Sequence, residues 1–279
     1  MAPPDLLVAG HIVKDITADG WRPGGSVLYA AAQAQKLGLR AGAVTVCGPD
    51  VQPQALLDVE WHIVRDTATT SFGNRYEAGS RTQRVPVTAR PLNLEDIPSD
   101  WRTAPIILLA PVFHDIAPGL PSQLAGRGAL LGLGAQGWLR SLHEGRVVAG
   151  RVEARPAWLA GDAVFVSEED VIDPEAVSVW QRVVPVVVLT RAGRGCSVWD
   201  ATGRHDLAAF ATNERDPTGA GDVFATAFLI RLKETGDTMA AARFGMAAAA
   251  LAVRQAGTES IGGREEIEAL IAAEPVKSR

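Results

Sequence analysis

Short runs of β-branched and apolar residues alternate with helical patterns along most of the chain. This alternation favours a parallel sheet with helices on both faces. Several of the runs are continuously apolar, as expected for strands that are covered on both sides. We expect strands over residues 6–13, 42–47, 106–111, 129–133, 164–167 and 184–190. We expect helices over residues 25–39, 175–181, 222–235 and 238–255.

Length and composition are consistent with one large α/β domain over residues 1–279, because 47% of the residues are hydrophobic and can form a core. The net charge of -5, without a long Lys/Arg run, argues against a nucleic-acid or membrane-surface partner. Cys47 and Cys196 lie far apart and predict neither a disulfide framework nor a zinc site. The start lacks a basic leader, and the apolar stretch 239–253 is too short to span a bilayer, so we expect a cytoplasmic protein.

One polar segment, residues 69–87, breaks the alternation and carries a turn signal at 77–80, which predicts a hairpin. Together with residues 15–23 it is expected to form a small β lid. The hairpin is rich in hydrogen-bonding side chains that suit a polyhydroxylated ligand, with Asn74, Arg81 and Gln83 as candidate contacts. The alternative is a solvated surface hairpin without a ligand.

Near the C-terminal end, residues 216–222 read Asp-Pro-Thr-Gly-Ala-Gly-Asp and lead directly into an apolar stretch. Backbone N–H groups at a helix start are unpaired and partly positive, so the turn formed by Gly219, Ala220 and Gly221 is a candidate anion hole. We expect Asp222, in the first turn, to stay ionised at neutral pH and to accept a proton from a nearby hydroxyl. The alternative is an ordinary helix N-cap after a glycine turn.

Two further segments carry candidate binding residues. Asp15 lies just past the carboxyl end of the first expected strand, where open α/β sheets bind ligands. Gly24 and Gly25 precede the next helix, where paired glycines let the backbone approach a ligand. A glycine-rich turn from Thr190 to Gly195 follows the most hydrophobic strand, where a nucleotide could lie across exposed backbone.

Over nearly its whole length the chain resembles the ribokinase-like family, the PfkB group of carbohydrate kinases. The resemblance is most specific at residues 216–222, which are similar to the second signature of that family and imply Asp222 as the catalytic base. The region around Gly24 and Gly25, with Leu37-Gly38 downstream, resembles the first signature and implies Asp15 as a sugar-binding residue. The fold implied is a three-layer α/β/α domain with a mainly parallel sheet and a small β lid.

In that family a sugar hydroxyl attacks the γ-phosphate of ATP, with magnesium bridging the phosphates. The resemblance therefore implies ATP and Mg²⁺ as cofactors, with K⁺ as a further candidate, and Asp170 as a residue that organises magnesium-bound water. The implied nucleotide contacts are Ser167, Thr190, Arg191, Gly193, Gly195, Thr218, Gly219 and Gly221. No Gly-x-x-x-x-Gly-Lys-Ser/Thr loop occurs, which argues against a P-loop kinase. No Gly-x-Gly-x-x-Gly follows the first strand, which argues against a dinucleotide-dependent dehydrogenase.

Within the family, the hairpin pattern Phe-x-Asn-x-Tyr-x-x-Gly-x-Arg-x-Gln over residues 72–83, with Gln-Gly-Trp-Leu-Arg at 136–140, is similar to the branch that phosphorylates myo-inositol. The implied acceptor contacts are Asp15, Gly24, Gly25, Tyr29, Asn74, Arg81, Gln83 and Gln136. The same set would suit a furanose or the ribose of a nucleoside.

The chain departs from the common family pattern at several positions. Tyr29 stands where many sugar-binding members carry Asn, Asp170 ends a segment where Asn-x-x-Glu is common, Ala192 replaces a glycine of the nucleotide loop, and Gly134 stands where an acidic residue often precedes Gln-Gly. These changes bear on substrate identity more than on phosphoryl transfer.

Two other interpretations and one partner remain open at this stage. One interpretation is a non-catalytic nucleotide- or sugar-binding protein on the same fold, and the other is a different α/β enzyme such as an eight-stranded barrel. The expected partner is a small polyol, and a homodimer through the lid would cover the edge of its short sheet.

Overall fold

The computed structural model describes residues 2–77 and 80–274, and in the lid hairpin it describes the backbone but not the side chains of residues 74–77 and 80–82. The main sheet contains β1 (Leu6–Ala9), β4 (Ala41–Cys47), β5 (Glu60–Arg65), β8 (Ile106–Leu109), β9 (Leu130–Gly134), β12 (Ala163–Ser167), β13 (Val186–Thr190), β14 (Cys196–Asp200) and β15 (Gly203–Leu207). The lid contains β2 (Val13–Thr17), β3 (Gly20–Gly24), β6 (Ser71–Glu77) and β7 (Ser80–Val87), and β10 (Ser141–His143) pairs with β11 (Arg146–Val148). The helices are α1 (Ser26–Lys36), α2 (Leu120–Leu124), α3 (Gln136–Leu139), α4 (Ala220–Thr235), α5 (Thr238–Ala252) and α6 (Arg264–Ala273).

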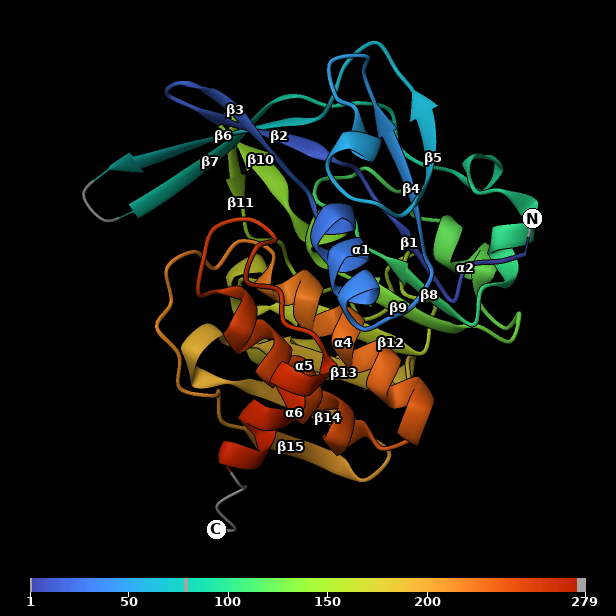
Figure 1. Ribbon diagram of the computed structural model, residues 1–279, viewed down its shortest axis with the longest axis vertical. Coiled ribbons are helices and arrows are strands. Elements are labelled where there is room, and N and C mark those ends of the chain that lie inside the picture. The colour runs from blue at the N-terminus through green and yellow to red at the C-terminus, as the bar shows by residue number, and fades with distance from the viewer. Residues whose placement is uncertain (1, 78–79, 275–279) are drawn as a thin grey trace.

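The main sheet is parallel over most of its width, as the strand–helix alternation predicts. Among the described residues the strand order is β15-β14-β13-β12-β9-β8-β1-β4-β5. The pairs from β13 across to β5 are parallel, and the two hairpin-connected strands β14 and β15 add an antiparallel edge. Figure 1 shows this sheet crossing the molecule, with α4, α5 and α6 packed together in its lower half.

Two apolar cores lie on opposite faces of the sheet, because successive side chains along each strand point to opposite sides. Leu6 and Val8 of β1 belong to the core under α1, α4, α5 and α6, whereas Leu7 and Ala9 belong to the core on the other face. Instead of long helices, the second core contains short helical segments and three tryptophans in contact, with Trp138 stacked on Trp158 and Trp158 edge-on to Trp180. The result is the three-layer α/β/α arrangement that the sequence predicts.

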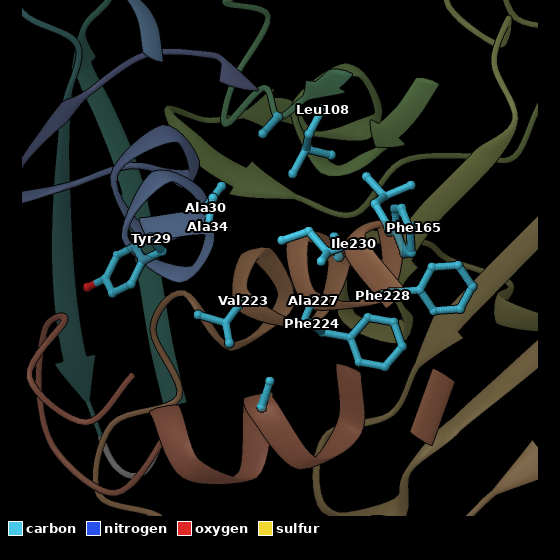
Figure 2. Close-up of a cluster of buried hydrophobic side chains, with 14 of the residues drawn as sticks. Tyr29, Ala30, Ala34, Leu108, Phe165, Val223, Phe224, Ala227, Phe228 and Ile230 are labelled. Carbon is cyan, nitrogen blue, oxygen red and sulfur yellow. The ribbon is translucent and has the colours of Figure 1, made fainter. Parts of the chain in front are cut away.

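Helix α4 is the centre of the first core. Phe224 and Phe228 on α4 pack against Phe165 of β12, with ring centroids 6.1 and 5.2 Å from that of Phe165 (Figure 2). Gly219 at the start and Gly236 at the end both adopt left-handed backbone conformations, so glycine sets both ends of the helix. Because the helix is buried from Val223 to Ile230, directly after its first turn, the core holds the start of the helix in a fixed position.

The single strand predicted over residues 6–13 is divided between the main sheet and the lid. The sheet strand ends at Ala9, and the chain begins a separate lid strand at Val13. The 69–87 hairpin is confirmed as β6 and β7, whose pairing places Asn74 opposite Gln83. Strands β2 and β6 run parallel, so the 15–23 and 69–87 segments form one four-stranded sheet, seen at the upper left of Figure 1.

The buried residue His11 links several chain segments at the base of the lid through hydrogen bonds. The ring of His11 accepts a hydrogen bond at Nδ1 from Thr70 Oγ1 at 2.8 Å and donates from Nε2 to the Arg90 carbonyl at 3.0 Å. Thr70 Oγ1 also accepts from the Ala89 amide at 3.0 Å. These bonds join the chain before β2, before β6 and after β7, which are three of the places where the lid meets the main domain. Burial lowers the pKa of His11, which favours the neutral ring that this pattern requires.

Other predicted elements differ in kind or in length. Residues predicted as an α-helix over 175–181 form a 3₁₀ helix, Pro174–Arg182, and β14, β15, β10 and β11 were not predicted. Helix 25–39 is shorter, ending at Lys36. No helix in the described part of the chain is both long and apolar enough to cross a membrane.

Candidate active site

A cavity of about 380 Å³ lies between the lid, the start of α1 and the start of α4. Its walls come from segments far apart in the sequence: β2 and the lid hairpin, the loop after β9, the turn after β13, and the residues before α4 and along α5. Of the residues predicted for the site, the cavity is lined by Asp15, Gly25, Tyr29, Gln83, Gln136, Ser167, Asp170, Thr190, Gly193, Gly195, Thr218, Gly219, Ala220, Gly221 and Asp222.

Asp222 lies in the first turn of α4, half-buried at the cavity wall. Burial raises the pKa of its carboxyl from 3.8 to about 6, while a hydrogen bond from Ser26 and the positive charge of Arg140 act in the opposite direction. The helix end therefore does not hold this pKa low, contrary to what the first-turn position suggested. The group is still mostly ionised at pH 7, and a base whose pKa lies this close to neutrality is well matched to proton transfer.

At the start of α4, two backbone amides are used in hydrogen bonds within the turn and two are not. The amide of Thr218 donates to Asp216 Oδ1 at 2.9 Å, and the amide of Ala220 donates to the Pro217 carbonyl at 3.2 Å. Within the part of the chain that the structure describes, no such bond is found for the amides of Gly219 and Gly221. Of the three residues predicted to form an anion hole, the two glycines are thus the ones whose amides are available to an anion, because the Ala220 amide is used within the turn.

The lid side of the cavity, which is the side predicted to hold the acceptor, combines polar and apolar surface. Asp15 on β2 and Gln83 on β7 line it from the lid, and Gln136 and Arg140 line it from α3 and the residue after it. Phe72, 3% exposed, contributes an apolar wall from β6. The arrangement provides hydrogen-bonding groups around one side of a small ring and a flat hydrophobic surface on another.

Gly24 and Gly25 pack closely against residues of this side of the cavity, where a side chain would not fit. A Cβ on Gly24 would lie 2.3 Å from Asp15 Oδ2, so a larger residue would displace that carboxylate. Gly25 has φ +98°, and a Cβ there would lie 2.3 Å from the His11 carbonyl. Gly24 therefore contacts Asp15 but does not line the cavity, whereas Gly25 does line it. The predicted side-chain contacts of Asn74 and Arg81 lie outside the described residues.

The side of the cavity beyond Gly219 and Gly221 is the one predicted to hold the phosphate donor, and we call it the donor side. It is lined mainly by backbone and apolar side chains. Ser167, Thr190, Gly193 and Gly195 line it from the ends of β12 and β13 and the turn after β13. Opposite them is an apolar wall made of Ala209, Phe210, Met246, Ala249, Ala250 and Val253. The glycine-rich turn lines the cavity, and its contact with a nucleotide stays a prediction. Its Ala192 has φ +46°, a conformation that glycine adopts more readily than alanine.

Arg191 is the exception on the donor side. Its guanidinium bonds with Ser197 and lies 3.4 Å from Asp206 on the neighbouring antiparallel strands. Arg191 is absent from the residues that line the cavity. The structure therefore places its side chain with β14 and β15 and not with the predicted nucleotide contacts.

Arg140 and Asp170 form an ion pair at the cavity wall, with Arg140 Nε 3.0 Å from Asp170 Oδ1. Asp170 is buried, at 4% exposure, and the described residues contain no cluster of three or more His, Cys, Asp or Glu side chains suited to holding a metal. Mg²⁺ usually keeps several waters and takes its other ligands from substrate phosphates. Glu169 and Asp170 line the cavity and fit that role, with water between carboxylate and ion.

Several functional candidates were missed from the sequence. Ser26, which bonds to Asp222, and the apolar donor wall carry no local motif. Arg140 was part of the Gln-Gly-Trp-Leu-Arg segment but was not predicted as a site residue. The signal that could have identified it is its position four residues after Gln136, just past the carboxyl end of a central strand.

Residues 162–262, which contain the 190–195 turn, the two glycines of the predicted anion hole and Asp222, match the model of the pfkB family carbohydrate kinases. A solved pyrophosphate-dependent kinase of the ribokinase family, bound to a pyrophosphate analogue and myo-inositol, superposes with a TM-score of 0.76 at 21% identity, covering 95% of this chain and 99% of that one. The chain has the ribokinase-like fold of the PfkB carbohydrate kinases. It is a phosphotransferase that acts on a hydroxyl group.

Two further relatives of this kinase differ in substrate. The ribokinase of Arabidopsis thaliana, solved with ribose and ATP, has a TM-score of 0.75 at 20% identity and covers 97% of this chain and 99% of its own. The cytidine kinase of Thermococcus kodakarensis is 27% identical over 244 residues, which are 81% of this chain and 87% of that protein. The fold is thus shared by relatives that use different acceptors and different donors.

Proposed function

We propose that this kinase transfers the γ-phosphoryl group of ATP to a hydroxyl of a polyol, with myo-inositol as the preferred acceptor. The observation that carries the proposal is the meeting of three groups in one cavity: the Asp222 carboxylate and the free amides of Gly219 and Gly221. A base beside an anion site is what transfer from a phosphate donor to a hydroxyl requires.

The residues divide the chemistry between them. Ionised Asp222 accepts the proton of the attacking hydroxyl, which becomes a better nucleophile as the bond to phosphorus forms. The amides of Gly219 and Gly221 donate hydrogen bonds to the phosphoryl oxygens as their charge develops. Mg²⁺, when bound, supplies charge neutralisation at the donor phosphates, and Glu169 and Asp170 are the residues that would hold it through water.

The acceptor assignment rests on the polar groups around the lid side of the cavity. Asp15 accepts hydrogen bonds, and Gln83 and Gln136 both donate and accept them, which suits a ring with hydroxyls on all sides. The solved relative that binds myo-inositol supports this choice. A nucleoside is the second candidate, because the curated relative is a cytidine kinase and the Phe72 side chain offers a surface against which a base could stack.

The donor assignment rests on the wall beyond the anion hole. Pyrophosphate is charged throughout and would gain little from the apolar surface formed by Phe210, Met246 and Val253. A purine ring is flat and largely apolar and would bury area against it. These contacts favour ATP, although solved relatives include pyrophosphate-dependent kinases. Dependence on K⁺ stays a prediction.

An acceptor and donor screen tests both assignments together. Myo-inositol, ribose, fructose and cytidine would each be offered with ATP or with pyrophosphate, and donor consumption would be measured with Asp222→Asn protein prepared in parallel to detect contaminating kinases. We expect myo-inositol with ATP to give the highest kcat/KM. A clear preference for cytidine would refute the acceptor assignment, and turnover with pyrophosphate alone would refute the donor assignment.

The pH dependence of the rate tests the role of Asp222 in the wild-type protein. Its raised pKa of about 6 predicts that kcat/KM is constant above pH 7 and falls about tenfold per pH unit below 6, because only the ionised carboxylate accepts a proton. The profile would be measured with a saturating donor and an acceptor that does not titrate in this range. A profile that is flat between pH 5 and 8 would contradict the assignment.

We also propose that the lid pairs with a second copy of the chain. Ile16 and Trp21 are paired neighbours on β2 and β3 and are 44% and 43% exposed. They lie on the lid face opposite Asp15, because consecutive strand residues point to opposite sides. Sedimentation should give the mass of a dimer, and a monomer at micromolar concentration would contradict this proposal.

A further inference from the structure

We propose that Tyr29 couples the two halves of the active site: its ring positions Gly219 of the anion hole, and its hydroxyl donates a hydrogen bond to the acceptor. This inference rests on the proposed function for the identity of the reaction, but the part that concerns Gly219 can be tested without an acceptor. It assigns two separable roles to one side chain.

The ring of Tyr29 lies directly on the backbone of Gly219. A Cβ built on Gly219 would be 2.2 Å from both Cγ and Cδ1 of Tyr29 and 2.7 Å from Cδ2. Gly219 has φ +79°, a conformation that glycine adopts without steric cost because it has no Cβ, so its own side chain does not fix the orientation of its amide. The flat ring covers one side of this residue and so restricts the orientation of its amide, one of the two that form the anion hole.

The position of Tyr29 is itself fixed by the core. The residue is on α1, 5% exposed, and α1 packs along α4 through small residues such as Ala30 and Ala34 facing Val223 and Ala227. Figure 2 shows the Tyr29 ring at the edge of this cluster, with its hydroxyl oxygen directed away from the apolar side chains. A rigid helix thus holds the ring against the start of a second rigid helix.

The hydroxyl of Tyr29 lies in a negative environment at the cavity wall. Burial, and next the carboxylates of Asp216, Asp15 and Asp222, raise the pKa of the Tyr29 hydroxyl well above its usual value of 10, so the group stays protonated at neutral pH. Because Tyr29 lines the cavity together with Asp15 and Asp222, an acceptor placed for attack lies next to this O–H group. A neutral hydroxyl that is kept protonated is suited to donating to an acceptor oxygen.

The two roles predict different kinetic changes. Tyr29→Phe keeps the ring and removes only the hydroxyl, so the acceptor KM should rise about 3- to 10-fold, as loss of one neutral hydrogen bond allows, while ADP binding stays unchanged. Tyr29→Leu keeps apolar volume but removes the flat ring from Gly219. We expect it to lower kcat by about 10- to 100-fold and to weaken ADP binding, because a small misplacement of a phosphate-binding group has effects of this size.

The test compares wild type, Tyr29→Phe, Tyr29→Leu and the control Leu28→Ala. Leu28 is the neighbouring residue on α1, equally buried at 5% exposure, and does not line the cavity. The Leu28→Ala variant therefore measures the effect of weaker packing of α1 without any change at the cavity. ADP affinity is measured by calorimetry without acceptor, and kcat and the acceptor KM are measured with the acceptor that gives the highest turnover.

Each outcome supports or overturns a defined part of the proposal. An unchanged acceptor KM in Tyr29→Phe overturns the role of the hydroxyl. Unchanged ADP affinity and kcat in Tyr29→Leu, or losses equal to those of Leu28→Ala, overturn the role of the ring. If Tyr29→Leu does not fold, Tyr29→Met serves in its place. Wild type that binds ADP but turns over no acceptor would refute the proposed function, while the ADP affinities would still decide the role of the ring.

Discussion

Asp222→Asn is expected to lower kcat by about 10³-fold, because a positioned general base contributes on the order of 10² to 10⁴ to a proton-transfer step. Asn fills nearly the same space and can keep a hydrogen bond to Ser26, so the loss would reflect the missing base and not a collapsed site. The measurement is steady-state kcat with saturating donor and acceptor. Activity within about fivefold of wild type would be incompatible with Asp222 as the base, since that loss is far below the general-base range.

The same substitution should make the protein more stable at pH 8. The pKa of Asp222 is about 6 in the folded protein and 3.8 ordinarily, so the folded state binds the proton more tightly. This raised pKa means that the charged form destabilises the fold by about 3 kcal/mol, a cost that appears as the pH rises through the interval between the two values. Removing the charge should therefore raise the free energy of unfolding by roughly 2 kcal/mol at pH 8, after allowing for burial of the Asn amide.

The control for this pair of effects is Asp58→Asn, which changes an exposed carboxyl far from the cavity. It should alter neither kcat nor the free energy of unfolding by a measurable amount. A protein that gains stability when it loses activity is the expected behaviour of a group retained for chemistry. If Asp222→Asn instead unfolds more easily, the burial penalty assigned to this carboxylate is wrong.

Gly219→Ala should have the second-largest effect, on both activity and stability. An alanine here would be strained at φ +79° and would place its Cβ 2.2 Å from the Tyr29 ring, so the turn or the tyrosine must move. Displacing one anion-hole amide should lower kcat by about 10²-fold or more. The steric conflict and the left-handed backbone together should lower the free energy of unfolding by roughly 2–4 kcal/mol.

Gly119→Ala is the matched control for that change. Gly119 has φ −84°, a conformation open to alanine, and no atom lies within 4 Å of a Cβ built there. Both variants would be compared by kcat and by urea unfolding. Retention of a tenth or more of wild-type activity in Gly219→Ala would show that the amide of Gly219 does not stabilise the transferred phosphoryl group.

The central helices and most parallel strands could be predicted because their signals are local. The apolar stretch after Asp222 and the alanine-rich stretch after Thr238 are long, and both helices appear with starts within two residues of the prediction. The first strand was predicted too long because the apolar pattern continues through Ile12, whereas the chain crosses from the sheet to the lid after Ala9. Periodicity does not record such a crossing when both elements are strands.

The candidate anion site and base could be proposed from the sequence, whereas their surroundings could not. The Gly-Ala-Gly-Asp turn lies within a single segment, but its spacing alone is equally that of a helix N-cap, and it became a candidate site only together with Asp15, Gly24-Gly25, the 190–195 turn and the family resemblance. The pKa of Asp222 and its bond to Ser26 depend on how α1 packs against α4, a contact between segments almost 200 residues apart in the sequence. Arg191 was predicted as a nucleotide contact because its turn was expected at the site. The turn does line the cavity, but the Arg191 side chain bonds to the neighbouring strands.

The most direct test of the account is to follow the labelled γ-phosphate of ATP in the presence of myo-inositol, with wild-type protein and with Asp222→Asn. We expect label to appear as a phosphate ester of the polyol, ATP consumption to depend on added polyol, and Asp222→Asn to bind ATP but transfer the phosphate about 10³-fold more slowly. Label released only as free phosphate regardless of polyol, or equal transfer by both proteins, would contradict it.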